Sequence, residues 1–126
     1  SLDSYSQKIL DHYRSPRHAG VLACASARGA AENPACGDRM RFFARVEDGL
    51  IAEVSCQTFG CAPSIAAGSL LTELVKGKPL QSLQIDASAI EKGLGGLPAM
   101  KRHAAVLAAD AFQNFVKDYH TIKTTN

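Results

Sequence analysis

Two cysteines, an aspartate and a histidine have the types and spacing that suit metal binding. Cys36 and Asp38 stand two residues apart, behind Pro34 and around a glycine. Residues i and i+2 of an extended segment point the same way, so this sulfur and this oxygen would face one centre. Cys61 follows a glycine at an expected strand-to-helix turn, and His103 stands at the head of the expected last helix. The sequence therefore favours metal-ligand chemistry, since it contains neither a glycine-flanked serine elbow nor a glycine-rich phosphate loop.

Each candidate ligand also has a purely structural interpretation. Unpaired N–H groups at a helix start favour a thiolate at Cys61, and a small core residue at a tight turn explains it equally well. The ligand interpretation is stronger for Cys36, because Asp38 adds an oxygen donor at ligand spacing. His103 taken alone is typical of a surface histidine in a first helical turn. Cys56 is expected in the core, and Cys24 has no partner at useful spacing.

Composition and charge exclude several classes of protein. The chain has 126 residues, 46% apolar and 21% charged, which predicts one globular domain over residues 1–126. A net charge of +2 is too small for a nucleic-acid-binding protein. No apolar run approaches the roughly 20 residues that span a bilayer, which argues against a membrane protein. The absence of a secretory signal predicts a cytoplasmic protein, in which the four cysteines stay reduced.

A β-hairpin is expected between the candidate ligands. Side chains alternate over residues 39–47, Asp48-Gly49 suits a two-residue turn, and the return strand alternates again. On this return strand the apolar face is expected to hold Leu50, Ala52, Val54 and Cys56. If the extended conformation continues through Gly37, Cys36 and Asp38 lie on the helix-covered side of the sheet, at its rim.

Helices are expected on both sides of this hairpin. The first runs from about Tyr5 to Arg14, with Ser4 and Gln7 at capping-box spacing. The segment 17–33 is expected to form a loop and a weak edge strand. Later helices are expected from Pro63 to Gly77, over residues 86–91 behind an Asp86 cap, and from about Lys101 to Tyr119, with a frayed tail from residue 121.

Four segments carry a resemblance to a known family. They are Tyr5-Ser6-Gln7-Lys8-Ile9-Leu10-Asp11-His12-Tyr13-Arg14-Ser15-Pro16-Arg17, Pro34-Ala35-Cys36-Gly37-Asp38, Thr58-Phe59-Gly60-Cys61 and Leu97-Pro98-Ala99-Met100-Lys101. Through them the chain resembles, nearly end to end, the iron–sulfur cluster assembly scaffolds, which are the IscU proteins and the NifU N-terminal domain. The resemblance implies an α+β fold, with a small antiparallel three-stranded sheet and helices packed on one face.

The resemblance also implies a ligand set. In the family three cysteines, an aspartate and a histidine hold a [2Fe–2S] cluster, or zinc in its absence. Cys36, Asp38, Cys61 and His103 match this pattern, but Ala104 stands where the third cysteine belongs. The methyl group of Ala104 cannot bind a metal or accept a persulfide. The remaining two thiolates, carboxylate and imidazole satisfy tetrahedral zinc, and an iron with an oxygen ligand is expected to be labile.

The implied function is that of a scaffold or carrier, not an enzyme. Its implied partners are a cysteine desulfurase, recipient apo-proteins and an Hsp70-type chaperone, which in the family recognises the segment matched by Leu97, Pro98, Ala99, Met100 and Lys101. Ala99 and Met100 replace a proline and a valine there, which weakens the expected chaperone contact. A homodimer around a shared cluster is physically conceivable. Two alternatives stay open: a zinc-binding degenerate homologue that regulates the desulfurase, and a zinc-dependent acceptor that takes a persulfide on Cys36 or Cys61.

Overall fold

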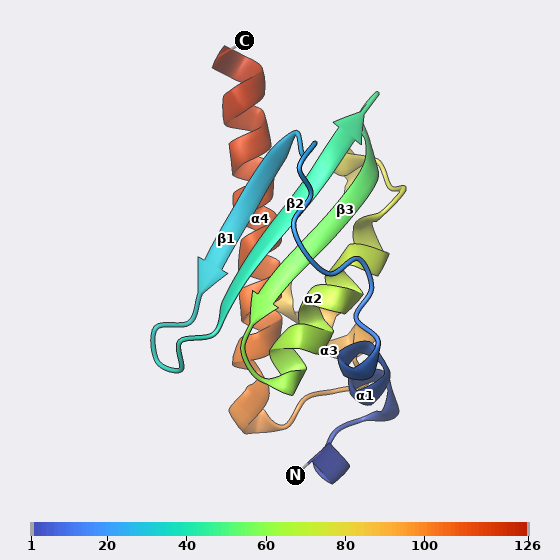
Figure 1. Cartoon of the computed structure of the whole chain (residues 1–126), viewed down its shortest axis with the longest axis vertical. Helices are drawn as coiled ribbons and strands as arrows, with labels where there is room; N and C mark the ends of the chain where they lie inside the picture. The colour runs from blue at the N-terminus through green and yellow to red at the C-terminus, as the bar shows by residue number, and fades with distance from the viewer. Residues whose placement is uncertain (1, 126) are drawn as a thin grey trace.

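A three-stranded antiparallel sheet in the order β1-β2-β3 forms the centre of the fold (Figure 1). The computed structural model describes residues 2–125. The strands are β1 (Ala27–Glu32), β2 (Arg39–Glu47) and β3 (Leu50–Phe59), and the α-helices are α1 (Gln7–Arg14), α2 (Ala62–Val75), α3 (Ala87–Gly93) and α4 (His103–Thr125). Three single-turn 3-10 helices are η1 (Leu2–Ser4), η2 (Leu80–Ser82) and η3 (Ala99–Lys101). None of the helices within residues 2–125 has both the length and the apolarity that crossing a bilayer requires.

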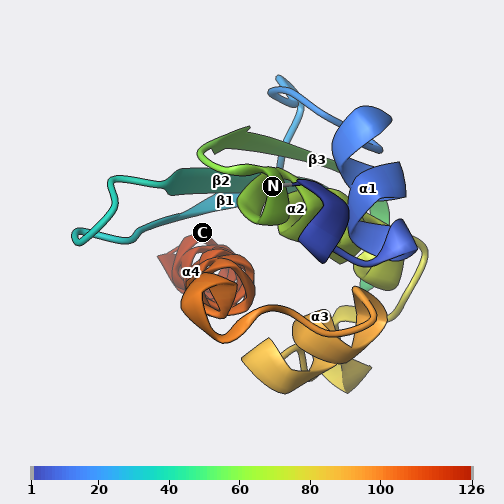
Figure 2. The same cartoon turned by 90° about the horizontal axis from the view of Figure 1, so that it is seen from below.

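The helices lie on one side of the sheet, as predicted (Figure 2). Helices α2 and α4 pack directly on it, α1 packs against α2, and α3 packs against both α2 and α4. Between these layers lies an apolar core that includes Ile9, Met40, Phe42, Ala44, Ile51, Leu71, Phe112 and Phe115. The segment 15–26 crosses the other face of the sheet (Figure 1). This arrangement confirms the predicted α+β class.

The hairpin is present, but part of its return strand faces the other way from the prediction. Val46 pairs with Ile51 and Arg45 with Glu53, so Ala52 is an extra residue at a bulge. A bulge reverses the alternation of side chains on one strand. Ile51 is therefore fully buried and Leu50 is 43% exposed, whereas the sequence pattern predicted the opposite. Beyond the bulge, Val54 and Cys56 are buried as predicted.

Two helix ends differ from their predicted positions. Helix α1 begins at Gln7 because Ser6, rather than Ser4, caps it: the Ser6 hydroxyl accepts a hydrogen bond from the Ile9 amide at 3.1 Å. Helix α4 continues to Thr125 instead of fraying from Thr121. Its last turns are held by side-chain contacts, since the Tyr119 ring stacks on Phe115 and lies under the Lys123 ammonium. The predicted Asp86 cap of α3 is confirmed.

Helix α4 covers the predicted edge strand, β1, at very short range. A Cβ atom added at Gly29 would lie 2.1 Å from both the Ala111 carbonyl oxygen and the Phe115 amide nitrogen. Two polar side chains of α4 bond to the outer edge of the strand. Asp118 accepts a hydrogen bond from the Arg28 amide, and Asn114 donates one to the Ala30 carbonyl. The close approach therefore depends on a residue without a side chain, and the bonds cover part of an edge that would otherwise be open to another strand.

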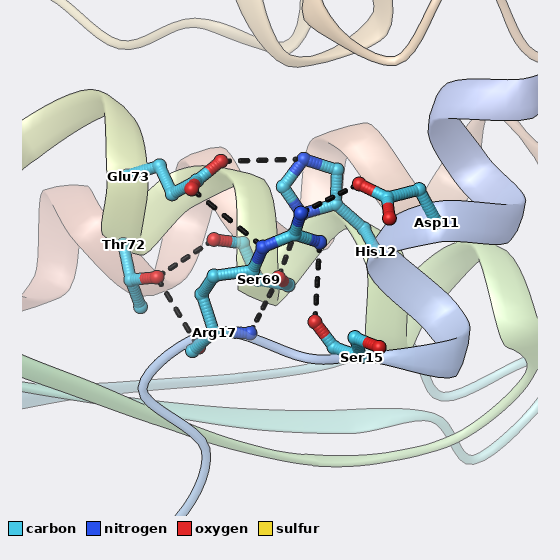
Figure 3. Close-up of polar contacts among 7 residues, drawn as sticks. All are labelled: Asp11, His12, Ser15, Arg17, Ser69, Thr72 and Glu73. Atoms are coloured by element: carbon cyan, nitrogen blue, oxygen red, sulfur yellow. Dashed lines mark hydrogen bonds and ion pairs between the residues drawn. The ribbon is translucent and has the colours of Figure 1, made fainter.

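A buried polar cluster joins α1, α2 and the segment after α1 (Figure 3). His12 Nδ1 lies 2.7 Å from the Ser69 hydroxyl oxygen, and His12 Nε2 lies 3.4 Å from a carboxylate oxygen of Glu73. The Ser69 hydroxyl also accepts a hydrogen bond from the Arg17 amide, and the Arg17 guanidinium pairs with Asp11 and Glu73. The buried His12 ring therefore helps to hold α2 against α1.

The pH dependence of stability should report this cluster. Burial and then the positive charge of Arg17 lower the pKa of His12 below 6.5, against the opposite effects of Glu73 and Asp11. The unfolded chain then binds a proton more readily than the folded one, so the free energy of unfolding falls as the pH drops below 6.5. Urea unfolding of His12→Gln between about pH 8 and pH 5.5 should show a smaller loss of stability than the wild type.

The matched control for this prediction is His120→Gln, because His120 lies exposed on α4. This variant should follow the wild-type pH dependence. Equal losses of stability in wild type and His12→Gln would show that His12 is not the titrating group.

Candidate functional site

The loop between β1 and β2 is a tight turn rather than a continued strand. Gly37 has φ +80°, and its amide donates to the Asn33 carbonyl at 2.7 Å. The extended conformation on which the common orientation of Cys36 and Asp38 was predicted is therefore broken at the glycine, and strand alternation does not set their directions. Instead, Cys36 is exposed and Asp38 is buried, with 8% of the residue accessible to solvent.

One carboxylate oxygen of Asp38 is the point on which the other candidate ligands converge. The Cys61 sulfur lies 3.2 Å from Asp38 Oδ2, and His103 Nε2 lies 3.4 Å from it. Cys61 Sγ and His103 Nε2 are themselves 3.9 Å apart. Three segments far apart in the sequence thus bring a thiol, a carboxylate and an imidazole to one place, at the rim of the sheet.

Cys36 joins this group from the exposed side. One donor atom from each of Cys36, Asp38 and His103 lies within 4.8 Å of the others. That group does not include Cys61, whose sulfur lies near Asp38 Oδ2 and His103 Nε2. Each of the two thiols therefore lies near Asp38 and His103, the two donors that all these contacts share. Ala104, which follows His103 at the start of α4, is fully buried.

Ser64 and Gly60, which the sequence did not reveal as site residues, hold the Asp38 carboxyl group in position. Ser64 is fully buried, and its hydroxyl donates to Asp38 Oδ2 at 2.7 Å. A Cβ atom at Gly60 would lie 2.6 Å from Asp38 Cγ, so the carboxyl group packs directly on that backbone. The one available signal was spacing, because Cys61 caps α2 and Ser64 lies three residues later, on the same side of the helix.

Hydrogen bonds outweigh burial at this carboxylate. Burial alone would raise the pKa of Asp38, but bonds from the Ser64 hydroxyl, from the thiol and amide of Cys61 and from His103 lower it to about 2. Hydrogen bonds that favour the charged form act in this direction. Asp38 is thus an anion at neutral pH, ready to bind a cation together with the neighbouring thiols.

The remaining cysteines lie away from this group. Cys56 is buried in the core as predicted, and burial raises the pKa of its thiol to about 12, against the weaker opposite effect of a bond with Thr58. Cys24 is exposed, and its sulfur lies 3.8 Å from a Glu53 oxygen. Neither belongs to the donor group, in agreement with the sequence-based prediction.

The segment from Leu97 to Lys101 immediately precedes the head of α4. Leu97 is buried at 8% exposure, which anchors the segment, and Met100 is 89% exposed. Residues Ala99–Lys101 form the turn η3. The segment therefore presents a large apolar side chain to solvent next to His103.

Comparison with known proteins relates the chain to one family. Residues 4–126 match the family described as NifU-like N terminal domain. The iron–sulfur cluster assembly scaffold protein IscU of Aquifex aeolicus is 45% identical over 91% of this chain and 75% of that protein. The IscU scaffold protein of Haemophilus influenzae is 40% identical over 92% of this chain and 95% of its own. The crystal structure of the N-terminal part of a NifU-like protein from Brucella abortus superposes with a TM-score of 0.78 at 19% identity, covering 95% of this chain and 96% of that one.

Proposed function

Because the chain belongs to the NifU-like N-terminal domain family, we propose that it is a scaffold on which an iron–sulfur cluster is assembled before transfer to recipient apo-proteins. The convergence of Cys61 and His103 on the Asp38 carboxylate, with Cys36 beside it, carries this proposal. The cargo is a labile [2Fe–2S] cluster held by these four side chains. The protein acts by binding and releasing this cargo rather than by catalysis.

The donor distances also suit zinc in the cluster-free form. Bonds of about 2.0–2.3 Å to a tetrahedral zinc place its ligand atoms roughly 3.3–3.8 Å apart. The separations of 3.2, 3.4 and 3.9 Å among the donor atoms of Cys61, Asp38 and His103 bracket this range. These side chains need to move little to surround a metal ion, while Cys36 closes the site from the solvent side.

Ala104 makes this a scaffold with two thiolates per chain. Its methyl group offers neither a ligand nor an acceptor for sulfur, so the sulfur that enters the site must reach Cys36 or Cys61. An iron bound partly through oxygen and nitrogen is held less firmly than one bound by thiolates alone. Such a site favours release of the cluster to a recipient, and a second chain sharing the cluster would supply the missing thiolates.

The partners follow from this role. A cysteine desulfurase supplies sulfur, and recipient apo-proteins take the cluster. An Hsp70-type chaperone binds the segment from Leu97 to Lys101, with the exposed Met100 as its apolar contact and a weakened fit at Ala99. The exchange takes place in the cytoplasm, on a single domain over residues 1–126.

Anaerobic reconstitution tests the proposal. The purified protein is incubated with ferric iron and sulfide, which supply an oxidised [2Fe–2S] cluster without a further oxidant, and cluster formation is followed by charge-transfer absorption in the visible range. Wild type should develop this absorption and lose it on addition of an apo-ferredoxin, and Ala104→Cys should retain it longer because of its third thiolate. Absorption in Ala104→Cys alone would show that this protein is not a working scaffold by itself. Tight zinc that ferrous iron cannot displace would instead favour a zinc-binding regulator.

Removing the hydroxyl that holds Asp38 should weaken metal binding. Ser64→Ala deletes the 2.7 Å hydrogen bond to Asp38 Oδ2 and leaves the carboxylate free to turn away from the other donors. Groups that orient a metal ligand typically contribute about 10- to 100-fold to affinity. We expect zinc affinity to fall about 10-fold, measured by competition with a chromophoric chelator.

Ser69→Ala is the matched control for this prediction. Ser69 is a buried serine on the same helix, but its hydroxyl bonds to His12 and to the Arg17 amide instead of to a candidate ligand. This variant should lose stability and keep wild-type zinc affinity. A Ser64→Ala protein that binds zinc as tightly as wild type would contradict the role assigned to the hydroxyl.

A further inference from the structure

The face of the sheet opposite the helices is uncovered at the end nearest the candidate ligands (Figures 1 and 2). Six residues define a sheet patch there: Ala30, Glu32, Arg39, Arg41, Gln57 and Phe59. With Ala31 and Met40 they line a concave space of about 530 Å³. Arg39 directly follows Asp38, and its cross-strand partner Phe59 lies two residues before Cys61. The sheet patch is thus continuous with the backbone of both ligand segments.

Two arginines of the sheet patch are stacked on aromatic rings and have no acidic partner within the described part of the chain. The Arg39 guanidinium lies 5.1 Å from the centre of the Phe59 ring, and the Arg41 guanidinium lies 5.1 Å from that of Phe43. Arg41 also donates to the Gln57 side chain. Among residues 2–125, no carboxylate forms an ion pair with either of them, and Glu32 lies opposite Arg39 without pairing with it. Stacking fixes the plane of a guanidinium and leaves N–H groups at its edge free for a carboxylate.

A third arginine on the same strand shows the contrast. Arg45 lies on the same face of β2, at the end far from the candidate ligands, and it pairs with Glu47 and Glu53. Within residues 2–125, the positive charge on this face is therefore neutralised by carboxylates at one end and left unpaired at the other. Phe59, at 49% exposure, adds a large apolar surface to the unpaired end. Arginine and exposed aromatic side chains together are typical of protein interfaces.

We propose that the sheet patch docks an acidic segment of a partner protein, whose carboxylates pair with Arg39 and Arg41 and whose apolar side chains cover Phe59. The sheet patch lies beside both ligand segments, which suits a partner that delivers or receives the cargo. This role of the partner rests on the proposed function, whereas the docking of an acidic segment does not. Glu32 favours an acidic peptide over a nucleic acid as the ligand. The evenly spaced phosphates of a nucleic acid would be repelled by the Glu32 carboxylate, whereas a peptide can place its carboxylates at the arginines alone.

Binding of a model acidic peptide tests the docking surface without any cluster. Capped heptaglutamate is titrated into the ¹⁵N-labelled protein, and amide shifts are recorded by NMR, with capped heptaglutamine as the uncharged probe. We expect shifts centred on Arg39, Arg41 and Phe59 that weaken as salt rises from about 50 to 300 mM. The double variant Arg39→Gln/Arg41→Gln should lower the affinity about five- to tenfold, since each exposed pair contributes modestly.

Two further variants serve as controls, and neither is expected to lower the affinity for heptaglutamate as the double variant does. Arg45→Gln removes the same charge from the same strand face and should change the affinity less than twofold. Glu32→Gln removes the one negative charge of the sheet patch and should raise it. Equal losses in Arg45→Gln and the double variant, or equal binding of heptaglutamine, would overturn the proposal. Tighter binding of a seven-nucleotide oligothymidylate through the same arginines would reassign the surface to nucleic acid. These results stand apart from cluster assembly, so either conclusion can fail without the other.

Discussion

Replacing Cys61 with serine is expected to abolish tight metal binding. Cys61 is one of two thiols in the donor group, and its sulfur lies within 4 Å of both Asp38 Oδ2 and His103 Nε2. Serine keeps the size and a hydrogen bond to Asp38 but loses the soft thiolate that zinc and iron prefer. Zinc affinity should fall at least about 100-fold, because a single thiolate then faces a carboxylate and an imidazole. Chelator competition and the visible absorption after reconstitution measure the two losses separately.

Cys24→Ser provides the control, because Cys24 is an exposed cysteine outside the donor group. It should match wild type in zinc affinity and in cluster absorption. The prediction would be wrong if Cys61→Ser kept its zinc, or if Cys24→Ser lost it to the same extent. Thermal unfolding of both metal-free variants separates loss of the site from loss of the fold.

Local patterns in the sequence were enough to predict most of the helices and strands, whereas the three-stranded sheet with helices on one face was implied by the family resemblance. The alternation in residues 39–47, the Asp48-Gly49 turn and the apolar stripes of the helices each depend on near neighbours along the chain. The bulge at Ala52 was not predictable in this way. It is set by how β3 pairs with β2, and a single extra residue reverses the sides of Leu50 and Ile51. Likewise the last turns of α4 are held by contacts that the period of the helix does not reveal.

In the candidate site, too, the sequence predicted which residues could be ligands but not how they are positioned. Cys36, Asp38, Cys61 and His103 were predicted because their types carry ligand chemistry, and the structure places each of the two thiols near Asp38 and His103. Their relative positions were predicted for the wrong reason. The turn at Gly37 breaks the strand alternation, and the packing of β3 and α2 around the carboxylate then orients Asp38. Serine and glycine are not metal ligands of the kind sought in the sequence. Only the structure therefore identifies Ser64 and Gly60 as the residues that hold the Asp38 carboxyl group in position.

Adding a single methyl group at Gly29 is expected to damage the fold more than most surface changes. In Gly29→Ala the new Cβ would lie 2.1 Å from two backbone atoms of α4 and 2.8 Å from a third. Backbone of a packed helix cannot rotate away as a flexible side chain does, so α4 must move off β1. That movement would strain the contacts of Phe115 and the bonds from Asn114 and Asp118 to the strand edge. We expect the free energy of unfolding to fall by at least about 3 kcal/mol, at the upper end of overpacking effects.

Urea unfolding followed by circular dichroism measures this loss, and Ala30→Ser serves as the neighbouring control. Ala30 points to the exposed face of the same strand, where a small polar side chain should change stability by less than about 0.5 kcal/mol. Because α4 begins with His103, a displaced helix should also carry the imidazole away from Asp38. Any folded Gly29→Ala protein should therefore bind zinc more weakly, although the atoms nearest the new Cβ belong to Ala111, Asn114 and Phe115 and not to a candidate ligand. Wild-type stability in Gly29→Ala would show that α4 does not approach β1 as closely as the structure places it.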